Sequence, residues 1–391
     1  MRQSPLDSAR YDLAIRLLSD ALGGPVAVQA VEPLGHDSAA VSRLVFSTSV
    51  SGVRSAVVKT VRTDGGTHGG QPFLRREIAA HRLLEMESAG PAVAARLFGY
   101  ALEEGVMVVE DVPGVTVAEI LLGEEPAPAT EALCALGSAL GQLHSQSVGR
   151  GEEYAELLVE LGAGEGELKW SGLDPDVDTL TEIERVARSL EFTPPPPAAD
   201  EYADLLRCVR TEHQVLAHVD SNPGNAIWEP SAQARLVDLE SSAWTHAAAD
   251  VTQLVMPFPF WSAHLSSLPA AVRQEVLDAY RLAMPKTWSS ESIIGVALVA
   301  PIVRRLARLA TIADDSASTG TRWRRRAQMI HQLDVTAVVG SALPRSLESV
   351  FPDLCQWLAH FRCEIAARWP EAVGTPIEPF PAYGGTRRST T

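Results

Sequence analysis

The sequence predicts an α+β fold of two lobes, in which a five-stranded antiparallel sheet with one helix precedes a larger, mainly helical lobe. The chain of 391 residues is longer than a single ordinary core supports, so two packed lobes are the default expectation. Short apolar runs between turn residues fill the first part of the chain and are typical of strands, whereas the rest has the apolar spacing of helices. We place the first lobe at residues 1–112, the second at 113–375 and a loosely ordered tail at 376–391.

The first lobe has the pattern of strands interrupted by a single long helix. Residues 11–23 show helical periodicity that stops at two glycines, as expected for a helix end. Five segments have the composition of strands, and they cover residues 26–31, 41–48, 55–61, 95–101 and 106–111. The gaps between the first three are short enough for an antiparallel meander. A glycine-rich loop at 63–70 leads into a predicted helix over 72–88.

The second lobe is predicted to be predominantly helical. Residues 129–147 place four leucines on one stripe, which indicates an amphipathic helix. Further helices are expected at 200–214 and through 269–370. The proline run that follows Thr193, residues 194–197, predicts an extended polyproline linker.

Composition argues against several classes of partner. The formal net charge of −16 disfavours nucleic acid, because a phosphate backbone favours basic surfaces. The four cysteines form no CxxC or Cys/His metal pattern, so we expect reduced thiols. The chain starts without the pattern of a signal peptide, and its most apolar stretch, 293–303, is about half the ~20 residues of a membrane helix. We therefore expect a cytoplasmic monomer or homodimer with no membrane partner.

The strongest chemical signal is a loop that contains Asp220 and Asn225, followed thirteen residues later by Asp238 at the end of a second short strand. Mg²⁺ prefers hard oxygen ligands, which the amide of Asn225 and the carboxylate of Asp238 can supply. Asp220 can orient a hydroxyl and accept its proton. Pro223-Gly224 provides the tight turn that brings Asn225 back towards Asp220. Alone, either segment is an ordinary loop or strand end, and their joint order and spacing indicate phosphoryl transfer.

A second signal comes from the first lobe. Lys59 interrupts an apolar strand, and Glu77 lies eighteen residues later beside the apolar stripe of the predicted helix. A carboxylate on a face that packs against the sheet needs a partner, and Lys59 is the natural candidate. The alternatives are a solvent-facing Lys59 and a Glu77 that pairs locally with Arg76 or His81.

These motifs resemble the aminoglycoside phosphotransferase family, which belongs to the protein-kinase-like superfamily of small-molecule kinases. The resemblance spans about residues 26–255 and implies a bilobal protein-kinase-like fold. Besides the strand Lys and helix Glu, it rests on five segments, which are Val108 to Gly114, Leu140 to Ser145, His218 to Asn225, Val237 to Glu240 and the segment around Asp250.

The resemblance implies a role for each matching residue of the catalytic segments. Asp220 would be the catalytic base, and Asn225 and Asp238 would bind Mg²⁺. His218 would brace the catalytic loop, and Asp250 would be a structural residue. Val219 stands where family members often have glycine.

The resemblance also implies how the first lobe would bind a nucleoside triphosphate. Lys59, steadied by Glu77, would contact the phosphates. The backbone of Glu110 and Val112 would hold the base at the hinge between the lobes. Ser38, in the turn formed by residues 34–40, would touch phosphate.

The expected function is ATP- or GTP-dependent phosphorylation of a small-molecule hydroxyl, on an antibiotic such as an aminoglycoside or nucleoside, or on a sugar or amino alcohol. A nucleotide-binding pseudokinase is the alternative. A protein kinase is disfavoured because the chain lacks an Asp-Phe-Gly sequence followed by a long activation segment.

Three further features have both a functional and a structural interpretation. Residues 150–206 contain fifteen acidic and four basic side chains, which would suit a polyamine-like acceptor or would be solvent-facing helix surfaces. Trp244, Trp261 and Trp288 would be acceptor platforms or core residues. The basic run 322–326 would be a helix face or would bind an anionic group.

Overall fold

The computed structural model describes most of the chain, including both lobes. The described residues are 8–34, 41–61, 70–86, 92–169, 195–230, 233–255, 266–289, 291–297, 299, 326–327, 329–334, 351–374 and 378–384. Among them, no helix is long and apolar enough to cross a membrane.

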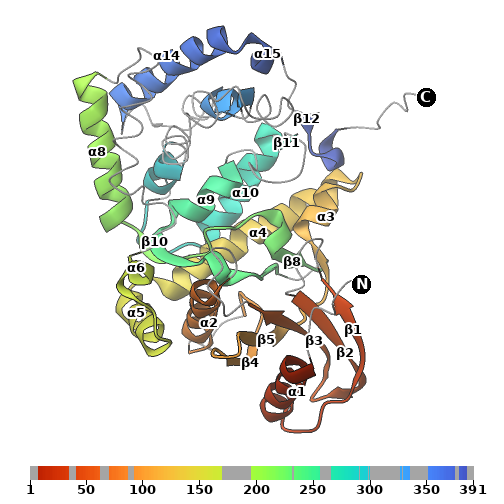
Figure 1. Cartoon of the computed structure of the whole chain (residues 1–391). Helices are drawn as coiled ribbons and strands as arrows, with labels where there is room; N and C mark the ends of the chain where they lie inside the picture. The colour runs from red at the N-terminus through yellow and green to blue at the C-terminus, as the bar shows by residue number, and fades with distance from the viewer. Residues whose placement is uncertain are drawn as a thin grey trace.

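The first lobe is built on a five-stranded antiparallel sheet (Figure 1), as the sequence predicts. Its strands are β1 (Val28–Pro33), β2 (Val41–Val50), β3 (Val53–Thr60), β4 (Leu97–Ala101) and β5 (Val106–Glu110). The spatial order is β1-β2-β3-β5-β4, so the first three strands form the expected meander. The hairpin of β4 and β5 adds to the sheet through β5, which pairs with β3. The end of β5 therefore lies inside the sheet and not at its edge.

A helix packs on each face of this sheet. Leu18 of helix α1 (Ser8–Leu22) lies in the same buried cluster as Val58 and Val108 of the sheet. Helix α2 (Gln71–Glu85) begins with a proline in its first turn, where the missing N–H costs no hydrogen bond. Its apolar residues join Met107 in the core that continues into the second lobe. Because side chains alternate along a strand, Lys59 and Val57 lie on the α2 side of β3, opposite to Val58.

The second lobe is mainly helical, and this confirms the predicted two-lobed α+β fold. Its helices are α3 (Val117–Leu121), α4 (Pro126–Ser147), α5 (Gly151–Glu160), α6 (Glu165–Leu168), α8 (Pro196–Thr211), α9 (Ala248–Val255), α10 (Ala270–Ala283), α14 (Pro352–Arg368) and α15 (Pro370–Val373). The leucine stripe of α4 is fully buried, as expected. Helix α10 lies against α4, where a Cβ on Gly137 or Gly141 would come within 2.7 Å of backbone oxygens of α10.

Besides its helices, the second lobe contains short strands and 3-10 turns, several of which hold the candidate catalytic segments. They are β6 (Val115–Thr116), β7 (Gln214–Ala217), β8 (Ala226–Trp228), β9 (Arg235–Leu236), β10 (Ala243–His246), β11 (Ser266–Ser267) and β12 (Glu378–Pro379), with 3-10 turns at Pro223–Asn225, Leu239–Ser241 and Pro381–Tyr383. Strands β8 and β9 form the predicted hairpin. Strand β9 also joins the lobes, because Leu236 exchanges backbone hydrogen bonds with Val93 and Ala95, just before β4.

Two expectations about irregular segments are wrong. Of the expected polyproline linker, Pro196 and Pro197 instead form the first turn of α8, since prolines fit a helix start, and residues 193–194 lie outside the described residues. Of the expected loose tail, residues 378–384 are packed on the second lobe, where Phe380 is 2% exposed and the Tyr383 and Thr130 hydroxyls are 3.1 Å apart. The lobe boundary at residue 112 stays a prediction.

Candidate active site

Lys59 contacts one carboxylate in each lobe. Its Nζ lies 2.6 Å from Oε1 of Glu77 on α2 and 2.5 Å from Oδ1 of Asp238, which follows β9. The side chain of Lys59 is only 13% exposed, so the alternative of a solvent-facing lysine is wrong. The local contact of Glu77 with His81 is longer, with His81 Nε2 at 4.0 Å from Oε1. The predicted Lys59–Glu77 contact is confirmed.

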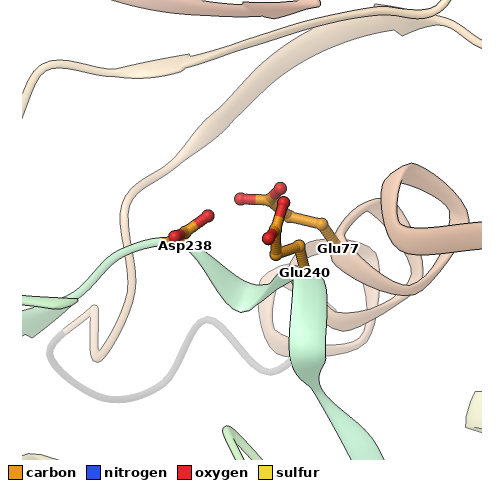
Figure 2. Close-up of side chains that lie close together, drawn as sticks. All are labelled: Glu77, Asp238 and Glu240. Carbon is orange, nitrogen blue, oxygen red and sulfur yellow. The ribbon is translucent and has the colours of Figure 1, made fainter. Parts of the chain in front are cut away.

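A third carboxylate, which sequence reasoning missed, lies beside this pair. Figure 2 shows Glu77, Asp238 and Glu240 directed towards one another, with one oxygen of each within 4.8 Å of the others. Burial and then the charge of Asp238 raise the pKa of Glu240 to about 7. Burial alone would lower the pKa of Lys59, but Glu77 and Asp238 outweigh burial and raise it. One firmly charged ammonium therefore faces three carboxyl groups.

The loop at residues 218–225 holds Asp220 with two amide side chains. Asn225 Nδ2 donates to the carbonyl oxygen of Asp220 at 2.9 Å and to its Oδ2 at 3.1 Å, and Asn222 Nδ2 donates to Oδ1 at 3.1 Å. Asn222 Oδ1 also accepts from the N–H of Gly224 at 2.8 Å, which closes the predicted tight turn. The loop thus fixes both carboxylate oxygens of Asp220.

Backbone contacts bring this loop next to Asp238. The N–H of Val237 donates to the carbonyl oxygen of Asn225 at 3.0 Å, and a ring nitrogen of His218 lies 2.9 Å from the carbonyl oxygen of Val237. Asp238 has a left-handed backbone, with φ of 63°, a conformation that Asp tolerates better than most residues. The structure therefore brings Asp220, Asn225 and Asp238 together, as the sequence predicts.

The free oxygens at this position suit a hard divalent cation. The carbonyl oxygen of Asp220 can only accept a hydrogen bond, so the amide NH₂ of Asn225 must face it. This leaves Asn225 Oδ1 without a donor among the described residues, and Lys59 occupies only one of the two oxygens of Asp238. An amide oxygen and a carboxylate oxygen are the donors that Mg²⁺ prefers.

Behind the loop, the buried carboxylate of Asp250 supports its backbone. Asp250 accepts from the N–H groups of His218 and Val219, both at 2.8 Å, and its Oδ2 lies 3.0 Å from His144 Nε2. Burial alone would raise the pKa of Asp250, but the contact with His144 lowers it. Val219 has φ of 68°, a left-handed backbone that is strained for a β-branched residue. A glycine would adopt this backbone conformation without that strain.

The model of the phosphotransferase enzyme family, APH, matches residues 36–290, more than half of the chain. The chain belongs to this family. It is therefore a small-molecule phosphotransferase, and the family and enzyme predictions are confirmed.

Solved structures similar to this phosphotransferase have low sequence identity to it. The choline kinase LicA from Streptococcus pneumoniae is 15% identical, with 84% of this chain and 100% of that chain covered and a TM-score of 0.44. The macrolide 2'-phosphotransferase MphH from Brachybacterium faecium is 18% identical, with 80% and 97% covered and a TM-score of 0.43. An aminoglycoside phosphotransferase from Alicyclobacillus acidocaldarius is 12% identical, with 85% and 93% covered and a TM-score of 0.49. A search of curated proteins finds no significant match.

At the predicted hinge of this phosphotransferase, two acidic side chains are held by the surrounding protein. Asp111 accepts from Arg43 at 2.8 and 3.0 Å and from Ser55 at 2.6 Å. Glu110 forms a bidentate pair with Arg235, which sequence reasoning missed. The N–H of Val112 has no hydrogen-bond partner among the described residues. Ser38 lies outside the described residues.

The described residues that the sequence suggested for acceptor binding mostly pack on, or pair with, other side chains of the protein. The ring of Trp244 packs on Tyr154, with centroids 6.4 Å apart, and the ring of Trp288 packs on His213 at 5.0 Å. In the described part of the acidic segment, Glu160 and Glu167 pair with arginines of α2. Trp261 and residues 170–194 and 322–325 lie outside the described residues.

Proposed function

We propose that this phosphotransferase transfers the γ-phosphoryl group of a nucleoside triphosphate, ATP or GTP, to a hydroxyl of a small molecule. One observation carries the proposal, which is that Lys59 of the first lobe contacts the metal-ligand candidate Asp238 of the second, beside Asp220. A lysine and two catalytic-loop side chains in this arrangement suit phosphoryl transfer, where catalysis consists mainly of positioning and charge neutralisation.

Asn225 and Asp238 would hold Mg²⁺. The cation would neutralise charge on the phosphates of the nucleotide. The proposal is supported by the free oxygens of both side chains and by the excess of carboxyl groups over ammonium around Lys59.

Asp220 would act as the base towards the acceptor. Its two oxygens are held by amide NH₂ groups, which fixes the carboxylate while leaving lone pairs for a substrate hydroxyl. As the acceptor oxygen forms its bond to phosphorus, the bond from phosphorus to the nucleoside diphosphate breaks, and Asp220 takes the hydroxyl proton. Lys59 would contact the phosphates at the same time.

The hinge would bind the base through its backbone. The N–H of Val112 lacks a partner among the described residues and would donate to the base, and the carbonyl oxygen of Glu110 would accept. Ser38 would contact a phosphate. Backbone contacts of this kind are compatible with adenine or guanine.

The acceptor would be an antibiotic, such as an aminoglycoside or a nucleoside, or a sugar or amino alcohol. The carboxylate of Asp220, which is held by Asn222 and Asn225, would face the acceptor, and its charge favours an acceptor that carries positive charge. No observation favours the pseudokinase alternative, since Lys59, Glu77, Asp220, Asn225 and Asp238 are all in place.

The test is Mg²⁺-dependent turnover of ATP and GTP with a panel of hydroxyl compounds, for the parent and for Asp220→Ala. We expect turnover to fall about 10²- to 10⁴-fold in the variant, with nucleotide binding retained. Asp334→Ala, which removes a carboxylate paired with Arg362 far along the chain, is the control and should keep parental turnover. Parental activity in Asp220→Ala would contradict the assignment.

A further inference from the structure

An ion pair with no assigned role joins the hinge to the metal-ligand strand. Arg235 on β9 donates from Nη1 and Nη2 to the two carboxylate oxygens of Glu110 on β5, both at 2.6 Å. Nη2 also donates to the carbonyl oxygen of Ala94 at 2.7 Å. The side chains are 20% and 24% exposed, so solvent screens this bidentate pair less than it screens a surface pair.

One end of this pair is fixed relative to Asp238. Only Leu236 and Val237 separate Arg235 from Asp238, and the backbone of both is hydrogen-bonded. Leu236 donates to Val93 at 2.8 Å, and Val237 donates to Asn225 at 3.0 Å. A displacement of Arg235 is therefore transmitted to Asp238.

The other end is fixed relative to the hinge. Glu110 is the last residue of β5 and pairs with Ala56 in the sheet. Its N–H donates to the carbonyl oxygen of Arg96 at 2.8 Å, and the N–H of Arg96 donates back to the Glu110 carboxylate at 3.1 Å. The N–H of Val112, which has no hydrogen-bond partner in the described part of the chain, follows two residues later. The backbone at the hinge would bind the base, and the carboxylate of Glu110 therefore connects this backbone to Arg235 of the second lobe.

We propose that Arg235 is a positioning residue, which couples the base-binding hinge to Asp238 through Glu110. This inference rests on the proposed function. The pair holds the lobes at the separation at which Lys59 reaches Asp238, 2.5 Å apart. When the hinge binds the base, Asp238 is then already in position to bind Mg²⁺. Binding of the nucleotide therefore favours binding of Mg²⁺, and the reverse holds equally.

The test compares Arg235→Gln, Glu110→Gln, the double variant and Arg235→Lys by steady-state kinetics and by nucleotide binding with and without Mg²⁺. We expect each glutamine variant to raise the nucleotide KM about tenfold, with kcat changed much less, and to weaken the effect of Mg²⁺ on nucleotide affinity. The double variant should resemble either single variant, because both remove the same interaction. Arg235→Lys keeps the charge and should recover part of the loss.

Arg362→Gln is the matched control, since Arg362 forms a bidentate pair with Asp334 at 2.7 and 3.2 Å within the helical lobe. It should leave the nucleotide KM unchanged. The inference is overturned if the glutamine variants change KM no more than this control does, or if their effects add in the double variant. A parent that binds no nucleotide would overturn the proposed function itself, which is a separate outcome.

Discussion

Helix α2 carries ion pairs on two faces, and the comparison shows how burial separates a functional pair from a supporting one. On the inner face, Glu77 is 2% exposed and contacts Lys59. On the outer face, Arg82 pairs with Glu160, whose side chain is 60% exposed. Both contacts join α2 to another element with N···O distances below 3 Å. The two ion pairs therefore have similar distances but differ in how far solvent reaches them.

The difference in surroundings changes what each pair can do. Burial, together with the negative charge of Asp238, raises the pKa of Glu77 despite the charge of Lys59. The inner charges cannot be replaced by water without a large cost. The outer pair stands in solvent and is screened by salt. We therefore expect the inner face to control activity and the outer face to contribute only to the placement of α2.

Among substitutions that remove an ion pair of α2, the largest effect is expected for Lys59→Met, which leaves Glu77 and Asp238 without their cation. Turnover should fall about 10²- to 10³-fold, as when a group that stabilises the transition state is removed. Stability should fall by about 3–5 kcal/mol, the usual cost of an uncompensated buried charge. Steady-state kinetics and urea unfolding measure the two effects. Lys169→Met removes an exposed pair with Glu165 and should change neither.

The second-largest effect is a dependence of stability on pH, and it comes from His81 of α2. Burial and then the charge of Lys59 lower the pKa of His81 to about 3, whereas an unfolded histidine titrates near 6.5. Between these values the unfolded chain binds more protons, so stability falls as pH falls. The loss from pH 7 to pH 5 should be about 2 kcal/mol for this residue.

His81→Asn should reduce this pH dependence, because asparagine cannot gain the charge. Urea unfolding at pH 7 and pH 5 measures the change for the parent and the variant. An equal loss of stability in both proteins would show that His81 is not the group responsible.

The smallest effect is expected on the outer face. Arg82→Gln should lower stability by less than about 0.5 kcal/mol, because exposed pairs contribute little, and 1 M salt should abolish the difference. Thermal unfolding at low and high salt is the measurement. A loss as large as that of Lys59→Met would break the distinction between the two faces.

Much of the inner face follows from local sequence. The strand that carries Lys59, the helix that carries Glu77 and the Asp220–Asn225 loop each have their own periodicity or turn residues. Their contacts follow from the rule that side chains alternate along a strand and repeat along a helix. The five-stranded sheet was predictable for the same reason.

The missed features depend on contacts between distant segments. Arg235 and Glu110 are separated by 125 positions, and a single arginine in a two-residue strand gives no sign of its partner. Glu240 stood two residues after Asp238, and only the 3-10 turn at Leu239–Ser241 brings it towards Glu77. The packed segment 378–384 was missed because its few apolar residues show no periodicity. Tertiary contacts decided these cases.

The most direct test of the account is the effect of Mg²⁺ on nucleotide binding in Asp238→Asn, because Asp238 is where the lysine of one lobe meets the proposed metal site of the other. Calorimetric titration of the parent with ATP or GTP should show binding that Mg²⁺ strengthens at least tenfold. The variant should bind nucleotide nearly equally with and without Mg²⁺. The same Mg²⁺ enhancement in Asp238→Asn and in the parent would contradict the account.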